Sequence, residues 1–279
     1  MVDTARHTID DLLQLMARLR DPDSGCPWDI RQDFASLVPF TVEEVYEVVD
    51  TIERGDYGHL GEELGDLLFQ VVFYARVAEE EGRFDFAAVV DGIVRKLLAR
   101  HPHVFPDGTL ASHRGTGEAD EGQVDEGQVK DQWEAIKAGE RQAKGHSGLL
   151  ADIPVALPAL ARAQKIQKRA ARVGFDWDAI DGVMAKTHEE MDELQRAIAA
   201  EDPAGIADEL GDLLFCCVNL ARHADLDAET VLRRATLKFE GRFTRMEELL
   251  AARAETFDGR DADALDRLWR EAKGSLEQD

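Results

Sequence analysis

"DELGDLLFCCVNLAR", residues 208–222, runs three acidic side chains straight into a long apolar segment, and the chain contains almost the same stretch earlier as "EELGDLLFQVVFYAR", residues 62–76. The two stretches are identical at ten of 15 positions and lie 146 residues apart (208 − 62). The segments "TVEEVYE" (41–47) and "THEEMDE" (187–193) have the same offset. Two separate segments repeated in one register indicate that the chain contains a duplicated domain.

The apolar residues of the opening stretch have the spacing of a helix. Leu210, Leu213, Leu214, Cys217 and Ala221 follow one another at intervals of one, three or four residues, which is typical of the buried stripe of an amphipathic helix. The chain shows no convincing alternation of a β-strand. The sequence therefore predicts an all-α fold with roughly four main helices in each copy, packed as a helical bundle.

We expect two tandem domains of similar length. The N-terminal domain covers residues 1–145 and the C-terminal domain covers residues 146–279. A segment rich in glycine and acidic residues, at about 108–127, lies between the repeated motifs. It is predicted to be a flexible loop that belongs to the first domain.

Composition limits the partners of the protein. The formal net charge is −24, from 57 Asp+Glu against 33 Lys+Arg. Because a surface this acidic repels nucleic acid backbones and anionic membranes, we expect no direct nucleic acid binding and no membrane association. Cys26, Cys216 and Cys217 lack disulfide or zinc spacing, and the adjacent pair is interpreted as small core residues. No signal peptide or membrane-spanning segment is predicted, which indicates a cytoplasmic protein.

The repeated acids have the arrangement of a metal site. Glu190 and Glu193 are three residues apart and share a helix face. Glu209 and Asp212 have the same spacing on the next helix, at the shoulder of the expected apolar stripe. If the two helices pack antiparallel, four carboxylates meet, and their repulsion requires a compensating charge. A hard divalent cation with oxygen ligands provides this charge, and Mg²⁺, or alternatively Mn²⁺, fits best.

Two other interpretations of these acids are open. The acids can form a solvated surface paired with lysine and arginine, but the presence of both pairs in both copies argues against this. A carboxylate-bridged di-iron site needs Glu-x-x-His on two helices. No histidine follows any of these glutamates at i+3, so the all-oxygen set favours magnesium over iron or zinc.

Basic and aromatic residues follow the acids in the second copy. Lys238 and Arg242 are one turn apart, as are Trp269 and Lys273, and Lys186 lies one turn before the acids at 189 and 190. Lysine and arginine neutralise phosphate oxygens, and an indole can stack on a base. These residues are candidate nucleotide contacts, although a surface ion pair or a core tryptophan has the same pattern.

The complete set of motifs resembles the MazG family of nucleoside triphosphate pyrophosphohydrolases. The resemblance rests on EExxE followed by ExxD, with "GCPWD" (25–29), "HPHVF" (101–105) and "RAQKIQKRAARVGFDW" (162–177) beside them. It covers nearly the whole chain apart from 108–129. It implies two tandem MazG-like domains of the all-α NTP pyrophosphatase type and a homodimer. It also implies Mg²⁺-dependent hydrolysis of nucleoside triphosphates, ATP included, to nucleoside monophosphate and pyrophosphate by water attack at the α-phosphorus.

The resemblance also implies roles for individual residues. Glu189 and Glu190 are expected to be catalytic, Glu189 by orienting or deprotonating the water. The expected metal ligands are Glu190, Glu193, Glu209 and Asp212. The expected nucleotide contacts are Lys186, Glu189, Asp208, Lys238, Arg242, Trp269 and Lys273. The equivalent residues of the first copy are Glu43, Glu44, Glu47, Glu63, Asp66, Lys96 and Arg100. One departure is Gly205, which stands where related proteins have a lysine.

The two copies differ at positions that bear on function. Phe40 aligns with Lys186, and Tyr46 aligns with Asp192, so the first copy loses a cation and gains apolar bulk. We therefore predict that the second copy is the active one. Two alternatives stay open for the whole protein: a narrower pyrophosphatase, for dUTP or phosphoribosyl-ATP, and a non-enzymatic helical interaction module with a vestigial acidic cluster.

Overall fold

The computed structural model describes residues 6–112 and 148–276, together with Gly127, Trp133, Ile136, Lys137, Gly139 and Glu140. All regular structure in these residues is helical, which confirms the all-α class. The chain divides into two compact units, Met1–Lys137 and Ala138–Asp279. Most of the predicted flexible loop at about 108–127 lies outside the described residues, and its first residues, 108–112, form bends and turns.

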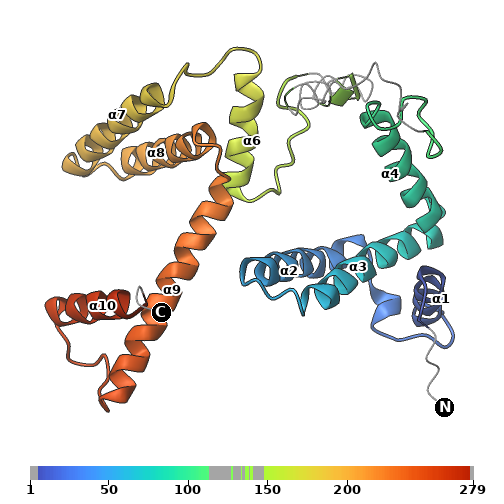
Figure 1. Cartoon of the computed structure of the whole chain (residues 1–279), viewed down its shortest axis with the longest axis horizontal. Coiled ribbons are helices and arrows are strands. Elements are labelled where there is room, and N and C mark those ends of the chain that lie inside the picture. The colour runs from blue at the N-terminus through green and yellow to red at the C-terminus, as the bar shows by residue number, and fades with distance from the viewer. Residues whose placement is uncertain are drawn as a thin grey trace, which may run out of the picture. The chain divides into compact units, whose positions relative to one another are not determined.

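The first unit is built around two long helices that lie side by side (Figure 1). Its helices are α1 (Ile9–Leu19), the short 3₁₀ turn η1 (Asp29–Arg31), α2 (Phe34–Glu53), α3 (Leu60–Glu80) and α4 (Phe86–Arg100). α2 packs along α3, and α1 and α4 also pack on α3. Side chains that accept hydrogen bonds from free backbone N–H groups begin these helices, such as Thr8 before α1, Asp33 before α2 and Asp85 before α4.

The core of the first unit lies where α1, α2 and α3 meet. It consists of the buried side chains Met16, Leu37, Val72, Phe73 and Val77. The aromatic rings of α2 and α3 surround it. This core fixes α2 against α3 and thereby places the acids of the two helices opposite one another.

The second unit contains a similar pair of long helices, and a further pair of packed helices follows it in the chain. Its helices are α6 (Ala159–Ala171), α7 (Ile180–Ala199), α8 (Pro203–His223), α9 (Ala228–Ala252) and α10 (Ala262–Leu276). α7 lies along α8, and α6 packs on α8 and α9 (Figure 1). α10 packs on the C-terminal half of α9, where Met246, Leu250, Leu268 and Ala272 form a buried cluster.

The buried face of α8 differs from the predicted stripe. Leu210 and Leu214 are 45% and 52% exposed, and Cys217 is also exposed. The helix instead buries Cys216, together with Val218. The prediction that Cys216 is a core residue is confirmed, whereas the prediction for Cys217 and for the stripe is wrong. The helix itself carries apolar residues on two of its faces. The spacing of these residues alone therefore does not decide which face packs inside the chain.

None of the described helices is both long enough and apolar enough to cross a bilayer.

Candidate metal and nucleotide site

A tight turn between α7 and α8 positions the site. Glu201 has a left-handed backbone conformation, with φ of 49°. Asp202 then accepts a hydrogen bond of 3.2 Å from the N–H of Ala204, and Pro203 opens α8. Because the turn is short, α8 runs back along α7, and the acids of the two helices face each other across one seam.

Three carboxylates meet in this seam. One oxygen atom each of Glu190, Glu193 and Glu209 lies within 4.8 Å of the others. Glu190 is only 4% exposed, and the other two are half-buried. Asp212, the fourth predicted ligand, is exposed and does not belong to this group of three. Asp208 and Glu189, at the edge of the seam, are exposed as well.

The electrostatics of the seam suit a bound cation. Burial raises the pKa of Glu209 above its ordinary value, and the charges of Glu193 and Glu190 raise it further, followed by those of Asp208 and Asp212. A divalent cation that binds these oxygens relieves the repulsion. Since all the donors are carboxylates, the set suits Mg²⁺ or Mn²⁺ better than zinc. The residues therefore fit a hard divalent cation.

The seam also contains cations of its own. The Nζ atom of Lys186 lies 2.8 Å from Oε1 of Glu190 and 2.9 Å from Oε1 of Glu189. The hydrogen bond to Glu190, and then that to Glu189, raises the pKa of Lys186. Arg196 donates a hydrogen bond of 3.1 Å to Glu193. Sequence reasoning placed Lys186 near a phosphate and missed its contact with the acids, which its i, i+4 spacing to Glu190 can indicate.

The glycine that replaces the lysine of related proteins lies close to the start of α8. A Cβ atom on Gly205 would lie 2.7 Å from Oδ2 of Asp202 and 3.4 Å from the Cβ of Ala197. The capping aspartate therefore fills the space beside this position. A longer side chain here requires Asp202 to move.

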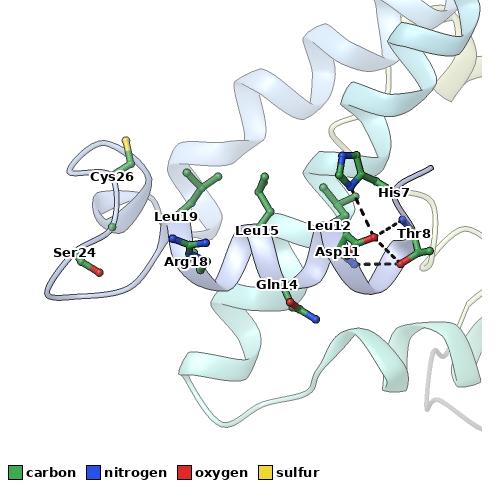
Figure 2. A pocket seen from close by; sticks show the side chains of 11 residues that line it. His7, Thr8, Asp11, Leu12, Gln14, Leu15, Arg18, Leu19, Ser24 and Cys26 are labelled. Atoms are coloured by element: carbon green, nitrogen blue, oxygen red, sulfur yellow. Dashed lines mark hydrogen bonds and ion pairs between the residues drawn. The ribbon is translucent and has the colours of Figure 1, made fainter. Parts of the chain in front are cut away.

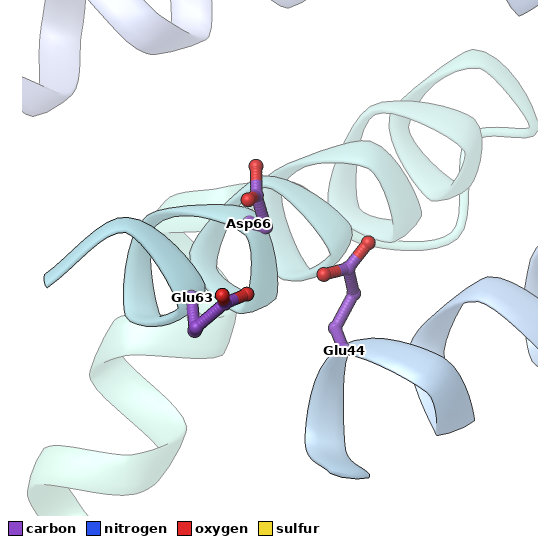
Figure 3. Close-up of side chains that lie close together, drawn as sticks. All are labelled: Glu44, Glu63 and Asp66. Carbon is purple, nitrogen blue, oxygen red and sulfur yellow. The ribbon is translucent and has the colours of Figure 1, made fainter. Parts of the chain in front are cut away.

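The first copy contains a similar group of acids (Figure 3). Glu44 on α2 points toward Glu63 and Asp66 on α3, and one oxygen of each lies within 4.8 Å of the others. Burial raises the pKa of Glu44, and the charge of Asp66 and then that of Glu47 raise it further. Glu47 is not one of the three, and Glu43 is exposed. Each copy thus brings three of its four predicted acids together, with a different one left outside.

Within the described part of the first unit, the cation of the second site has no counterpart. Phe40 occupies the position of Lys186 and packs against the core of the first unit, with its ring centroid 5.5 Å from that of Trp28. Among the described residues, no lysine or arginine forms an ion pair with Glu44, Glu63 or Asp66. Lys96 and Arg100, the predicted equivalents of Lys238 and Arg242, lie on α4.

Four of the predicted nucleotide contacts of the second copy form a separate group on α9 and α10: Lys238, Arg242, Trp269 and Lys273. The Arg242 guanidinium lies 5.7 Å from the centre of the Trp269 ring, and the Phe239 ring lies 5.1 Å from it. Lys238 is exposed on α9, and Lys273 lies one turn beyond Trp269 on α10. In the part of the chain that the structure describes, α10 packs on α9 and has no comparable packing on α7 or α8. The structure therefore gathers these four residues on one helix pair, and places the acids together with Lys186 on another.

A groove along α1 was not predicted (Figure 2). It has a volume of about 660 Å³, and Leu12, Leu15 and Leu19 line one side of α1 in it. At its end, Thr8 caps the helix, and Asp11 accepts a hydrogen bond from the backbone N–H of Thr8. None of the predicted site residues lines this groove. The leucine spacing along residues 12–19 is the sequence signal that indicates an apolar face here.

Comparison with known proteins agrees with the fold and the acidic motifs. The family model described as the MazG nucleotide pyrophosphohydrolase domain matches residues 32–105 and 179–246, which hold the two acidic sites. A protein of Escherichia coli strain K12 named nucleoside triphosphate pyrophosphohydrolase is 49% identical over 267 residues, which cover 95% of this chain and 97% of that protein.

Proteins of two other bacteria are similar at lower identity. The nucleoside triphosphate pyrophosphohydrolase/pyrophosphatase MazG of Thermotoga maritima is 40% identical over 268 residues, or 96% of each chain. A nucleoside triphosphate pyrophosphohydrolase of Mycolicibacterium smegmatis is 32% identical over 244 residues, 87% of this chain and 60% of that protein. The family matches both copies, and the similarity extends over nearly the full length of two relatives. The chain therefore belongs to the MazG nucleotide pyrophosphohydrolase family.

Proposed function

We propose that the protein hydrolyses nucleoside triphosphates to nucleoside monophosphate and pyrophosphate at the α7–α8 seam of its second unit. The observation that carries this proposal is the meeting of Glu190, Glu193 and Glu209 within 4.8 Å, with Glu190 buried. The names of the similar proteins from Escherichia coli and Thermotoga maritima support the same activity.

The acids of the seam are proposed to hold Mg²⁺, or Mn²⁺ in its place. Glu190, Glu193 and Glu209 provide the inner ligands, and Asp212 joins them from the exposed side of α8. When bound, the cation lowers the pKa of a coordinated water and neutralises part of the triphosphate charge. The all-carboxylate donor set supports a hard cation of this kind.

The remaining residues of the seam act on water and phosphate. Glu189 is exposed beside Glu190 and is proposed to orient the attacking water and to accept its proton. Asp208, on α8, stands at the same edge. Lys186 is proposed to bind a phosphate oxygen of the substrate. Water attack at the α-phosphorus breaks the bond to the β-phosphate, and pyrophosphate leaves.

The α9–α10 group is proposed to bind the nucleotide. Lys238, Arg242 and Lys273 provide positive charge for phosphate oxygens, and the Trp269 ring, already in contact with Phe239 and Arg242, provides a face for the base. The acidic seam of the first unit, together with Lys96 and Arg100 on α4, is proposed to be a second, weaker site. The absence of a lysine at position 40 supports the choice of the second copy as the active one.

The larger organisation follows the same resemblance. We propose that the units correspond to domains at 1–145 and 146–279 and that the protein forms a homodimer. The exposed leucines of α8, Leu210 and Leu214, and their equivalents on α3, Leu64 and Leu68, support a second copy as the covering partner. A cytoplasmic location stays a prediction from the cysteine pattern.

Hydrolysis of a panel of nucleoside triphosphates in H₂¹⁸O tests the reaction. We expect Mg²⁺-dependent release of pyrophosphate and ¹⁸O in the nucleoside monophosphate. Label found in pyrophosphate alone would exclude attack at the α-phosphorus. Activity restricted to dUTP or to phosphoribosyl-ATP would support the narrower enzymes, and no activity with any member of the panel would support the interaction module.

A further inference from the structure

The two acidic sites differ most at the position one turn before their central glutamate. In the second site this residue is Lys186, with its Nζ atom 2.8 Å from Glu190 and 2.9 Å from Glu189. In the first site it is Phe40, whose side chain belongs to the surroundings of the core. The second site thus carries a cation tethered to the protein, and the first site, within the described residues, does not.

Glu190 has little access to water and therefore depends on a bonded counter-charge. Its side chain is 5% exposed, while that of Lys186 is 34% exposed. A buried carboxylate without a cation or hydrogen-bond donor is strongly destabilised, and the ammonium group provides both. The contact with Lys186 thus provides the buried carboxylate of Glu190 with a bonded partner of opposite charge inside the seam.

A divalent cation at the same site requires the same carboxylate. Glu190 is the buried member of the group whose oxygens converge within 4.8 Å. A divalent ion and an ammonium group that share one carboxylate repel each other. Binding of either cation to Glu190 therefore weakens the binding of the other.

We propose that Lys186 is a tethered competitor for the metal, which holds Glu190 until a divalent cation displaces it and which then binds a phosphate of the substrate. This inference rests on the proposed function, because it takes the seam to be the metal and substrate site. It adds that Lys186 lowers the metal affinity of the second site. It also adds that the ammonium group of Lys186 moves from Glu190 to a phosphate of the substrate when the metal binds.

The proposal predicts how the two copies differ in metal binding. The first site binds a divalent cation without displacing a lysine, so it binds the metal more tightly than the second site in the absence of substrate. Metal and nucleotide promote each other's binding in the second site, since metal binding frees the ammonium group that the phosphate uses. Such coupling is reciprocal in free energy.

Titration of the full-length chain with Mn²⁺, with free Mn²⁺ measured by electron paramagnetic resonance, tests this without substrate. The second site is measured alone in a Glu44→Gln, Glu63→Gln background. There, Lys186→Met is expected to tighten Mn²⁺ binding roughly tenfold, the factor expected for removal of a charged hydrogen bond. Lys165→Met, which removes a lysine exposed on α6, is the matched control and is expected to change the affinity by less than about twofold.

The sign of the change separates competition from damage. A variant that distorts the seam binds Mn²⁺ more weakly, whereas a variant that removes a competitor binds it more tightly. Lys186→Gln is the second variant, because its amide can still donate a hydrogen bond to Glu190 and so preserve folding; it too is expected to tighten binding. Unchanged or weaker Mn²⁺ binding in both variants overturns the proposal.

The same variants keep this inference distinguishable from the proposed function. With nucleoside triphosphate, Lys186→Met is expected to raise KM while its Mn²⁺ binding is tighter. If the wild-type chain hydrolyses triphosphates and neither variant binds Mn²⁺ more tightly, the competition fails and the function stands. If the chain hydrolyses no triphosphate, the function fails, and the Mn²⁺ titration alone decides whether Lys186 competes for Glu190.

Discussion

At the scale of single residues, the equivalent glutamates Glu190 and Glu44 provide the sharpest comparison between the two copies. Both sit in a group of three acids, but among the residues that the structure describes only Glu190 has a lysine at its carboxylate. We expect Glu190→Gln to lower the rate of triphosphate hydrolysis by at least about a hundredfold, since loss of even an outer partner of a metal costs about 10–100-fold. Glu44→Gln is expected to lower it far less. The rate of pyrophosphate release at saturating Mg²⁺ measures both, and equal losses would remove the distinction between the copies.

The raised pKa of Glu209 predicts how stability varies with pH. In the folded protein this carboxyl binds a proton more readily than in the unfolded chain, where its ordinary pKa is 4.5. Its contribution to the free energy of unfolding is therefore complete below pH 4.5 and is lost as pH rises through the higher folded-state value. At neutral pH the charged group repels Glu193 and Glu190 and destabilises the fold.

Replacement of the Glu209 carboxyl by an amide tests whether its charge destabilises the fold at neutral pH. In EDTA, Glu209→Gln is expected to unfold at a higher temperature than the wild type near pH 7, with the difference shrinking as the pH falls below 4.5. Added Mg²⁺ is expected to raise the wild-type unfolding temperature more than that of the variant. Thermal unfolding followed by circular dichroism across pH measures both. A variant less stable than the wild type in EDTA at pH 7 would contradict the repulsion.

The spacing of the acids predicted which residues belong to the seam, but not which three of the four bring their oxygen atoms together. Glu190, Glu193 and Glu209 meet, while Asp212 stays outside the group. Four residues of equal charge in one motif do not reveal which side chain turns away, because this depends on rotamers and on local cations. The contact of Lys186 with Glu190 was not predicted either, since the same spacing suits a lysine that extends into solvent.

At the scale of helices, periodicity predicted the α-helical class and failed on the packing face of α8. Leu210 and Leu214 were expected inside and are about half exposed. The segment from Leu213 to Val218 is apolar at every position, and such a run fits several rotations of one helix. What decides the rotation is the fit to α7 and α6, including the hydrogen bond from Gln167 to the carbonyl of Phe215, which spacing does not contain.

Replacement of two helical glycines in the second unit by alanine is expected to change the free energy of unfolding in opposite directions. A Cβ atom on Gly182, near the start of α7, would overlap Cδ1 of Trp177 and would lie 3.1 Å from its Cγ. We expect Gly182→Ala to lower the free energy of unfolding by about 1–3 kcal/mol, because the indole ring must move. Gly241→Ala, in the middle of α9 with open space around it, is expected to raise it by up to about 1 kcal/mol. Urea unfolding compares them, and stabilisation by both substitutions would show that Trp177 is loosely held.

At the scale of the whole molecule, the repeat at an offset of 146 residues predicted two related units, and the structure contains two similar acidic helix pairs. The sequence also predicted that acids, basic residues and a tryptophan act on one nucleotide. In the described residues the acids and Lys186 lie on α7 and α8, and Lys238, Arg242, Trp269 and Lys273 lie on α9 and α10, so the joint site stays a prediction. The sequence motifs show which acidic, basic and aromatic side chains the chain contains. How helices far apart in the sequence pack depends on contacts that no local pattern contains.

The exposed leucines of α8 predict that the chain assembles with a second copy. Leu210 and Leu214 are one turn apart and about half exposed, and Leu64 and Leu68 repeat this arrangement on α3. Apolar faces of this kind on two helices are unfavourable in water and are stabilised by burial against a partner. We expect the wild-type chain to have twice the mass of one chain by light scattering after size-exclusion chromatography.

A single charge on this face separates assembly from folding. Leu214→Glu is expected to shift the protein toward the mass of one chain, because burial of a glutamate in an apolar contact is costly, while the helical circular dichroism stays unchanged. Val155→Glu is the matched control, since Val155 is 83% exposed and lies outside the helices, and it is expected to leave the mass unchanged. If Leu214→Glu keeps the double mass at micromolar concentration, the partner covers a different surface, and the exposed stripe of α8 then needs another explanation, such as contact with the substrate.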